Sequence, residues 1–395
     1  MSPKSLTAKA GQQQPDDNST SMELKKILEV ACTASLLSLQ NLKIIGTPGS
    51  GKTSILHFMA RQIFGGEYEE GGHYLKIECT PSLRPERISG HESPLYMLTE
   101  ESKRNGMAKW VYDKTPRDPV VWHVILNELP RVGDIARDNL LPIMDADLNI
   151  YHPVTFWTDG NTPMNAPSAA ALNDRFSLNI FYEHPIVDVH GIMRHGKPAN
   201  WHYEVPTWEA IQTVRQWLAD WMQNGYDTNA YWCIQNAIDT MLEVLPGTEF
   251  VVNNRRISQW IGVLYAMGAY GAGKPDFDTL PLEAFEAWSY CYPTESQLQS
   301  LKFRSFVMKN VDPVGTKIAE FEQQAVQHFQ DMYASIKDIR NGTERQQRLE
   351  REVGAKLAQY QKQLATEFHG DARSKAAINR LTAAYKQMGN GTFGK

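Results

Sequence analysis

The chain has 395 residues, enough for about two to three domains, and its 42% hydrophobic and 22% charged residues are typical of a globular protein with a sizeable core. With 40 Lys and Arg against 45 Asp and Glu, the net charge of −5 provides no overall field for nucleic acid or an anionic membrane, and we expect neither as a partner. No apolar run approaches the roughly 20 residues of a membrane span, and four widely spaced cysteines indicate a reducing compartment, so we predict a cytoplasmic protein.

The first part of the chain leads into a glycine-rich loop. Residues 1–21 are polar and rich in Gln, Ser, Asp and Pro, which predicts a disordered tail, and the apolar spacing predicts a helix over 22–39. A short buried strand is expected at 42–45 and a helix at 54–64, with the sequence GTPGSGKT between them. Strand, glycine loop and helix in this order are the context of the phosphate-binding pattern G-x-x-x-x-G-K-[ST].

This loop predicts a nucleotide site. Its glycines let backbone N–H groups turn toward a phosphate, and the start of the helix adds partial positive charge. Lys52 is expected to reach the β- and γ-phosphates, and the Thr53 hydroxyl to ligate Mg²⁺. The predicted nucleotide-binding set is Gly46, Thr47, Pro48, Gly49, Ser50, Gly51, Lys52, Thr53 and Ser54.

Strands and helices alternate up to about residue 181. Further strands are expected at 74–79, 120–126, 154–158 and 176–181, with helices at 134–144 and 169–174. The connection over 80–119 is long, and such insertions are often functional. The alternation predicts an α/β core over 22–190, a parallel sheet of five strands with helices on both faces.

Polar side chains follow two of these strands directly. Asn127 and Glu128 come after one buried strand, and Asn161 follows the next. Because ligands of parallel sheets bind beyond the carboxyl ends of the strands, these residues are expected to converge on the nucleotide held by the glycine loop. Hydrolysis needs a group that orients water, a magnesium ligand and a γ-phosphate sensor, and these residue types can serve. The alternative for Glu128 is an ordinary surface carboxylate at a strand end.

After residue 190 the pattern becomes wholly helical. Helices are expected at 208–222, 231–244, 257–270 and 282–291, which form an all-α domain over 191–300. Its tryptophans stand at helical spacing and are expected in the core rather than as a base-stacking surface: Trp208, Trp217, Trp221, Trp232, Trp260 and Trp288. Residues 301–395 predict three polar helices with narrow apolar stripes, arranged as helical hairpins or a short coiled coil. Whether this extension binds a partner stays open.

Several segments carry a resemblance to the AAA+ ATPases, and within them to the MoxR family. VILNELPR at 124–131 resembles the Walker B run of that family, and TDGNTP at 158–163 resembles its sensor-1 segment. LNDRF at 172–176 is similar to its arginine-finger segment, and NNRRI at 253–257 to the sensor-2 entry of a lid helix. LPLEAF at 280–285, followed by Trp288, resembles the lid of RavA-type members.

The resemblance implies ATP as the nucleotide and a ring, usually a hexamer, that shares each catalytic site between subunits. Glu128 would activate water, Asn161 would sense the γ-phosphate, and Arg175 would act on the nucleotide of a neighbouring subunit. Such an arginine finger supplies on the order of 10³–10⁵ in rate. Arg255 or Arg256 would contact the nucleotide from the lid, although both also suit a solvated helix start, and Arg175 also suits an ion pair with a local acid such as Asp174.

Two residues depart from the family pattern. Asn127 stands where the family usually has Asp; its amide oxygen would hold a magnesium-bound water without contributing charge, so metal affinity and turnover are expected to be lower. Pro130 replaces the usual Asn of the same motif, which affects the local turn.

Three functions are compatible with these motifs. The first is an ATPase ring that remodels or matures a protein partner, which in this family is often a protein with a von Willebrand factor A domain. The second is a McrB-like GTPase motor coupled to a nuclease, which GTP preference would identify. The third is a low-turnover nucleotide-dependent scaffold or switch, suggested by Asn127 and the helical extension.

Overall fold

The computed structural model describes residues 17–98, 100, 109–144, 154–161, 169–182, 204–225, 227–292, 296–337, 339 and 341–389. It divides into two compact units: Lys25–Val311, and Asp312–Lys395 grouped with Met1–Leu24. Most of the predicted N-terminal tail, residues 1–16, lies outside the described residues, and the first helix, α1 (Asp17–Ser38), begins at Asp17.

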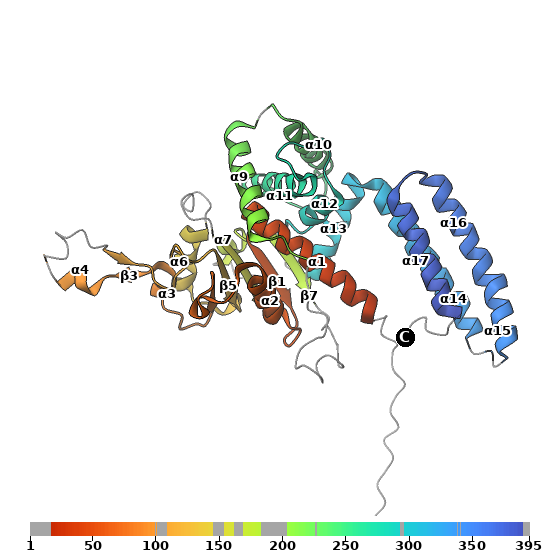
Figure 1. Cartoon of the computed structure of the whole chain (residues 1–395), viewed down its shortest axis with the longest axis horizontal. Coiled ribbons are helices and arrows are strands. Elements are labelled where there is room, and N and C mark those ends of the chain that lie inside the picture. The colour runs from red at the N-terminus through yellow and green to blue at the C-terminus, as the bar shows by residue number, and fades with distance from the viewer. Residues whose placement is uncertain are drawn as a thin grey trace, which may run out of the picture. The chain divides into compact units, whose positions relative to one another are not determined.

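A five-stranded parallel sheet organises the first unit (Figure 1). Its strands are β1 (Leu42–Gly46), β2 (Tyr74–Glu78), β5 (His123–Asn127), β6 (Thr155–Gly160) and β7 (Leu178–Tyr182), in the order β2-β5-β6-β1-β7. All four strand pairs are parallel. In this order β6 is the neighbour of β1, and β5 is the neighbour of β6. The residues that follow β1 therefore lie next to those that follow β6, and the residues that follow β5 lie one strand further away. This sheet and the helical regions after it confirm the predicted fold class.

Alternation along the strands gives the sheet two covered faces. Leu75, Val124 and Phe156 belong to an apolar cluster with the helices α3 (Glu86–Ser89), α6 (Asp134–Met144) and α7 (Ala170–Asn173). On the other face, His123 stacks on Phe64 of α2 (Lys52–Phe64), and the indole of Trp157 donates to Ser35 of α1. Side chains alternate between the two faces along each strand, so residues 78, 127 and 159 point to this second face, the side of the sheet that carries α2.

The long connection after β2 forms a small separate structure. It contains α3, the two-stranded sheet of β3 (His91–Glu92) and β4 (Trp110–Val111), and α4 (Pro94–Leu98). Residues 101–108 of this connection lie outside the described part of the chain. The described part of this half also contains the short 3₁₀ turns η1 (Tyr68–Glu70) and η2 (Leu129–Arg131).

Among the residues that the structure describes after the sheet, the same unit contains the helices α9 (Trp208–Asn224), α10 (Asn229–Val244), α11 (Asn254–Ala272), α12 (Leu282–Ser289) and α13 (Gln297–Val311). The side chains of Thr207, Thr228 and Asn253 cap the first three by accepting a backbone N–H of the first turn. Trp260 and Trp288 are fully buried, as expected for core residues. Trp232 is 56% exposed on α10, so its assignment to the core was wrong.

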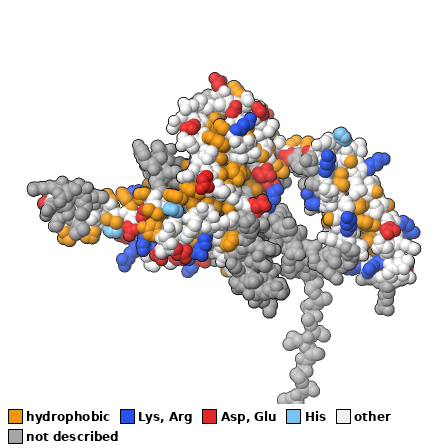
Figure 2. Space-filling model, viewed as in Figure 1, with side chains coloured by type: hydrophobic (Ala, Val, Ile, Leu, Met, Phe, Trp, Pro, Cys, Tyr) orange, Lys and Arg blue, Asp and Glu red, His pale blue; other side chains and the backbone are white. Residues whose placement is uncertain are grey.

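The second unit is built from long helices around its own apolar core. They are α14 (Pro313–Ile336), α15 (Gly342–Leu349), which continues through the π-helical turn η5 (Glu350–Gly354) into α16 (Ala355–Glu367), and α17 (Ala372–Gly389). The predicted apolar stripes meet inside, with Phe329, Val353, Leu364 and Leu381 fully buried. Lys and Arg side chains are prominent on the face of this unit seen in Figure 2. Within the described ranges, none of the helices has the length and apolar character needed to cross a membrane.

Candidate functional site

The glycine loop connects β1 to α2 at the carboxyl edge of the sheet. Gly49 and Gly51 have φ values of +76° and +83°, which are in the left-handed region where a side chain is strained. Gly51 directly precedes α2, so the loop delivers the chain into the first turn of the helix at Lys52. These two glycines therefore allow the loop to curl around the helix start, which is the geometry that presents backbone N–H groups to an anion.

Lys52 is folded into this loop and reaches the end of the neighbouring strand. Its ammonium donates to the carbonyls of Gly46 and Thr47 at 2.9 and 2.7 Å, and to Oδ1 of Asn161 at 3.0 Å. The pKa of Lys52 is lowered overall, because the effect of burial outweighs the nearby carboxylates of Asp159 and Glu128, which act to raise it. The predicted loop lysine and the predicted γ-phosphate sensor thus occupy one site.

Three polar residues form a row across the ends of β2, β5 and β6. Glu78 pairs with Asn127 in the strand register, and Leu126 pairs with Thr158, which places Asn127 opposite Asp159. Laterally paired residues in a parallel sheet point to the same face and lie about 4.8 Å apart. The row is therefore Glu78, Asn127, Asp159, on the face that carries α2.

Asp159 contacts Thr53, the residue that follows the loop lysine, and the sequence motifs gave it no role. The Thr53 hydroxyl donates to Asp159 Oδ2, and the backbone N–H of Glu128 donates to Oδ1 at 2.7 Å. Asp159 is only 2% exposed. One signal in the sequence was available: an aspartate within the buried run VTFWTDG must find hydrogen-bond donors or a cation.

Asn127 lines a cavity together with Thr53 and Glu78. Its Nδ2 donates to Oε1 of Glu78 at 2.9 Å, and its Oδ1 is buried with no hydrogen-bond partner among the described residues. The pKa of His57 on α2 is lowered overall by burial and by the nearby Lys76, and Asn127, which lies near that ring, offsets this only in part. The metal-ligand role of Asn127 stays a prediction, and the Thr53 hydroxyl is paired with Asp159.

Glu128 occupies a constrained turn directly after β5. It is one of the non-glycine residues with positive φ, at +53°, and its carboxylate accepts from Arg131 at 2.7 Å and from the Asn161 amide at 3.3 Å. Pro130 fits in the 3₁₀ turn that follows, and a side chain at Gly160 would meet the Pro130 ring at 2.7 Å. The unusual proline is thus accommodated by the glycine between Asp159 and Asn161.

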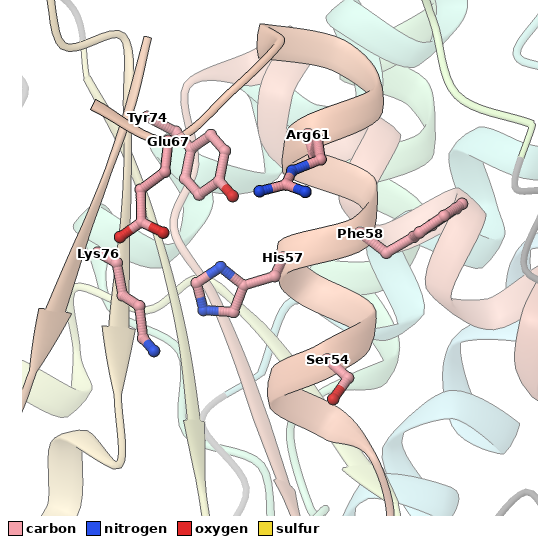
Figure 3. A pocket seen from close by; sticks show the side chains of 7 residues that line it. All are labelled: Ser54, His57, Phe58, Arg61, Glu67, Tyr74 and Lys76. Atoms are coloured by element: carbon pink, nitrogen blue, oxygen red, sulfur yellow. The ribbon is translucent and has the colours of Figure 1, made fainter. Parts of the chain in front are cut away.

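Two cavities open beside this site. One, of about 290 Å³, is lined by Thr53, Lys76, Glu78, Cys79, Thr80, Asn127, Glu128 and Arg131. The other, of about 350 Å³, lies between α2 and β2 and is lined by Ser54, His57, Phe58, Arg61, Glu67, Tyr74 and Lys76 (Figure 3). Ser54, predicted to bind nucleotide, stands in the first turn of α2 at the border of this second cavity.

Arg175 lies at the amino edge of the sheet, where the parallel strands begin, opposite to the carboxyl edge that carries the phosphate loop. Its guanidinium donates to the carbonyls of Leu141 and Ala171 at 3.2 and 2.8 Å, and its own carbonyl accepts from Asn41, which directly precedes β1. The five residues of β1 separate this edge from the phosphate loop, a rise of roughly 16 Å. Arg175 cannot reach the loop of its own chain without moving the strands.

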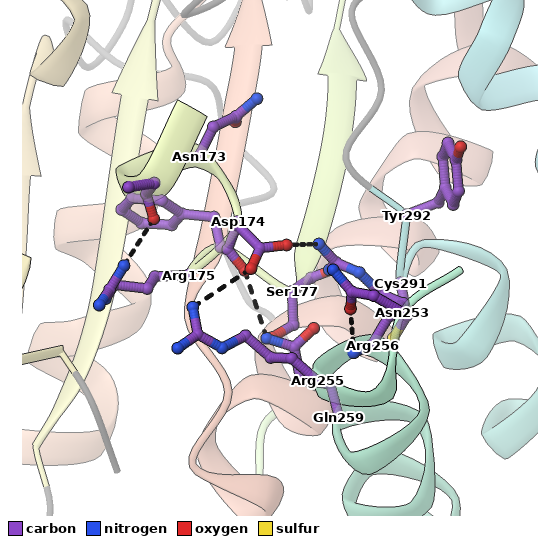
Figure 4. A network of polar contacts seen from close by, with 12 residues as sticks. Asn173, Asp174, Arg175, Ser177, Asn253, Arg255, Arg256, Gln259, Cys291 and Tyr292 are labelled. Atoms are coloured by element: carbon purple, nitrogen blue, oxygen red, sulfur yellow. Dashed lines mark hydrogen bonds and ion pairs between the residues drawn. The ribbon is translucent and has the colours of Figure 1, made fainter. Parts of the chain in front are cut away.

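Arg255 and Arg256 bind the same edge of the sheet from the start of α11 (Figure 4). Their guanidinium groups pair with the two carboxylate oxygens of Asp174 at 3.2 and 3.1 Å. Arg256 is 2% exposed, and burial lowers its pKa while Asp174 raises it. Both arginines therefore join the helical half of the unit to the segment before β7, and neither lies at the phosphate loop.

Comparison with known proteins identifies no family. No family model matches the chain, and a search of curated proteins finds no match. A crystal structure of a candidate ATPase from Cytophaga hutchinsonii is similar at 13% identity and a TM-score of 0.44, over 75% of this chain and 95% of that one. A similarity at this TM-score carries no weight for function, so the functional conclusion depends on the site.

Proposed function

We propose that this chain is an ATP hydrolase of the AAA+ type, related to the MoxR family, that works as a ring and remodels or matures a protein partner. One observation carries the proposal: Lys52 of the glycine loop, Asn161 after β6 and Glu128 after β5 are joined by hydrogen bonds into one polar site. Residues far apart in the sequence meet there at the carboxyl edge of a parallel sheet, where such folds bind ligands.

Each residue at this edge has a role that its position suits. The loop and Lys52 bind the phosphates, with the ammonium transferred from loop carbonyls to phosphate oxygens. Asn161 positions the terminal phosphate, and Glu128 orients the attacking water once its carboxylate is released from Arg131. The pairing of Glu128 in this structure favours, as a second candidate, a switch with low turnover.

Mg²⁺ fits the donors at this site. The hydroxyl of Thr53 and the carboxylates of Asp159 and Glu128 are oxygen donors, the type that Mg²⁺ prefers. Among the described residues there is no group of three or more His, Cys, Asp or Glu that forms a metal cage, so the ion would arrive with the nucleotide phosphates. When bound, it neutralises charge on the phosphates.

Arg175 completes the proposed site only from a neighbouring subunit. Its place at the amino edge of the sheet, on the carbonyls of Leu141 and Ala171, keeps it from the nucleotide of its own chain. A closed ring would bring this edge of one subunit to the carboxyl edge of the next. The ring, its hexameric size and a partner with a von Willebrand factor A domain follow from the family resemblance.

Nucleotide binding and turnover measured on the same preparation test the proposal. We expect the wild type to bind ATP, Lys52→Ala to lose binding, and Glu128→Gln to bind ATP while losing at least 100-fold in turnover. Binding of ATP without effect of Lys52→Ala would contradict the site. Preference for GTP would instead identify the McrB-like motor, and unchanged slow turnover in Glu128→Gln would identify the switch.

A further inference from the structure

The carboxylate nearest to Thr53 in the hydrogen-bond network stands on β6, not on β5 where the family pattern predicts an aspartate. Residue 127, at the end of β5, is the position at which the resemblance predicts aspartate, yet it is an asparagine whose amide contacts Glu78. Thr53, the loop residue expected on the metal, has its hydroxyl on Asp159 at the end of β6. Both Asp159 oxygens are engaged, since Oδ1 accepts the N–H of Glu128.

The strand register makes this displacement a lateral step of one strand. Asn127 and Asp159 stand side by side on β5 and β6, and Asp159 is itself paired with Ile44 of β1. β1 is the strand that leads into the phosphate loop. A carboxylate on β6 is therefore one strand closer to Thr53 than a carboxylate at position 127 would be.

From this geometry we infer that Asp159 supplies the carboxylate that holds Mg²⁺ at the nucleotide site, and that Asn127 is a positioning residue outside the metal shell. The inference rests on the proposed nucleotide site and assigns its metal support to a residue that the sequence motif does not mark. Thr53 and Asp159 then face the ion together, while Glu128, which is tied to Asp159 through its backbone, is aligned by the same carboxylate.

The row of polar residues also explains why residue 127 is an amide. A carboxylate there would stand between Glu78 and Asp159, about 4.8 Å from each, and three like charges in a row repel. The Asn127 amide instead donates to Glu78. Burial raises the pKa of Glu78, but the hydrogen bonds from Lys76 and Asn127 outweigh it and lower that pKa overall. With the carboxylate placed on β6, a neutral donor on β5 avoids this repulsion and hydrogen-bonds to Glu78.

The experiment compares Asp159→Asn with Asn127→Ala by titrating a non-hydrolysable ATP analogue in EDTA and in Mg²⁺. Asp159→Asn is nearly isosteric, and its side-chain oxygen can still accept from the N–H of Glu128. We expect its affinity in EDTA to stay within about twofold of wild type, and the gain in affinity on adding Mg²⁺ to fall by about 10–100-fold. Asn127→Ala should keep the full gain. Mn²⁺ bound with the analogue, counted by electron paramagnetic resonance, should fall in the same variant that loses the Mg²⁺ effect.

The outcomes separate this inference from the proposed function. Loss of the Mg²⁺ effect in Asn127→Ala with retention in Asp159→Asn would overturn the assignment of Asp159 and leave the nucleotide site intact. Loss of binding in EDTA as well as in Mg²⁺ for Asp159→Asn would also overturn it, because the residue would then support the loop rather than the metal. A wild type that binds no nucleotide in either buffer would overturn both proposals. Should Asp159→Asn not fold, Asp159→Ser gives the same comparison.

Discussion

Restoring the aspartate that the family pattern predicts at position 127 should weaken this protein. In the Asn127→Asp variant the new carboxylate would lose the hydrogen bond to Glu78 and stand about 4.8 Å from both Glu78 and Asp159. At an effective dielectric constant of about 20, one such repulsion with buried Asp159 is about 3.5 kcal/mol. Glu78 is mostly exposed and contributes less than about 1 kcal/mol.

Protonation of the new aspartate sets an upper limit to the destabilisation that this repulsion can cause. Raising the pKa of an aspartate from about 3.9 to 7 costs about 4 kcal/mol, after which the new group binds a proton instead of repelling its neighbours. We therefore expect Asn127→Asp to lower the free energy of unfolding by about 3 kcal/mol at pH 7. For a unit of this size that is a fall of roughly 6 °C or more in the unfolding temperature.

Thermal denaturation in EDTA, followed by circular dichroism, measures this loss. Asn229→Asp is the matched control, since Asn229 also donates to a carboxylate, Asp278, at 2.8 Å, but on the surface; it should change the free energy of unfolding by less than about 0.5 kcal/mol. The pKa of the carboxyl group introduced at position 127 would lie higher in the folded state than in the unfolded state, so lowering the pH from about 7.5 to about 5.5 should shrink the deficit relative to wild type. An Asn127→Asp protein as stable as wild type, or a deficit that grows at low pH, would refute the reasoning.

Two further predictions concern stability in the same unit. Burial, and then the nearby Arg215, lower the pKa of His123 well below 6.5, so between these pH values the unfolded chain binds a proton that the folded chain does not. The free energy of unfolding is therefore complete above about pH 6.5 and falls below it by up to about 1.4 kcal/mol per pH unit. Urea denaturation at about pH 7.5 and about pH 5.5 should show this fall, His123→Gln should reduce it, and an equal fall in both proteins would contradict the prediction. Asp174→Asn leaves buried Arg256 without its carboxylate and should cost about 2–4 kcal/mol of unfolding free energy, whereas Arg255→Ala, at a site 45% exposed, should cost under about 1 kcal/mol. Equal losses in these two variants would show that the burial of Arg256 does not matter.

The sheet could be predicted because its information is local. Each strand is a short apolar run that ends at a polar or glycine residue, and each long helix repeats its apolar side chains every three or four positions. Convergence of Lys52, Glu128 and Asn161 followed from one general rule, that parallel strands present their carboxyl ends at a common edge. No long-range contact had to be known for that step.

The contacts of individual side chains could not be predicted in this way. Asp159 and Asn127 are adjacent only through the register of β5 and β6, which is set by pairing between distant parts of the chain. The pairing of Arg255 and Arg256 with Asp174 likewise depends on how α11 packs at the amino edge of the sheet. Exposed Trp232 shows that helical spacing gives a side chain's direction but not whether another element covers it.

The proposed role of Arg175 as an arginine finger predicts that an isolated chain catalyses poorly, and mixed subunits test this directly. Lys52→Ala keeps the arginine but lacks the phosphate lysine, while Arg175→Ala keeps the phosphate loop but lacks the arginine. If the finger acts on the neighbouring nucleotide, each variant alone should lose on the order of 10³-fold or more in ATP turnover. In a random equal mixture, about one interface in four combines an intact loop with an intact arginine, so turnover per subunit should recover to about a quarter of wild type. Arg61→Ala, which removes an exposed arginine paired with Glu70, serves as the control and should stay near wild type. A mixture that assembles but remains as inactive as its components would show that Arg175 does not act across the interface, and an active Arg175→Ala protein would show that it is no finger at all.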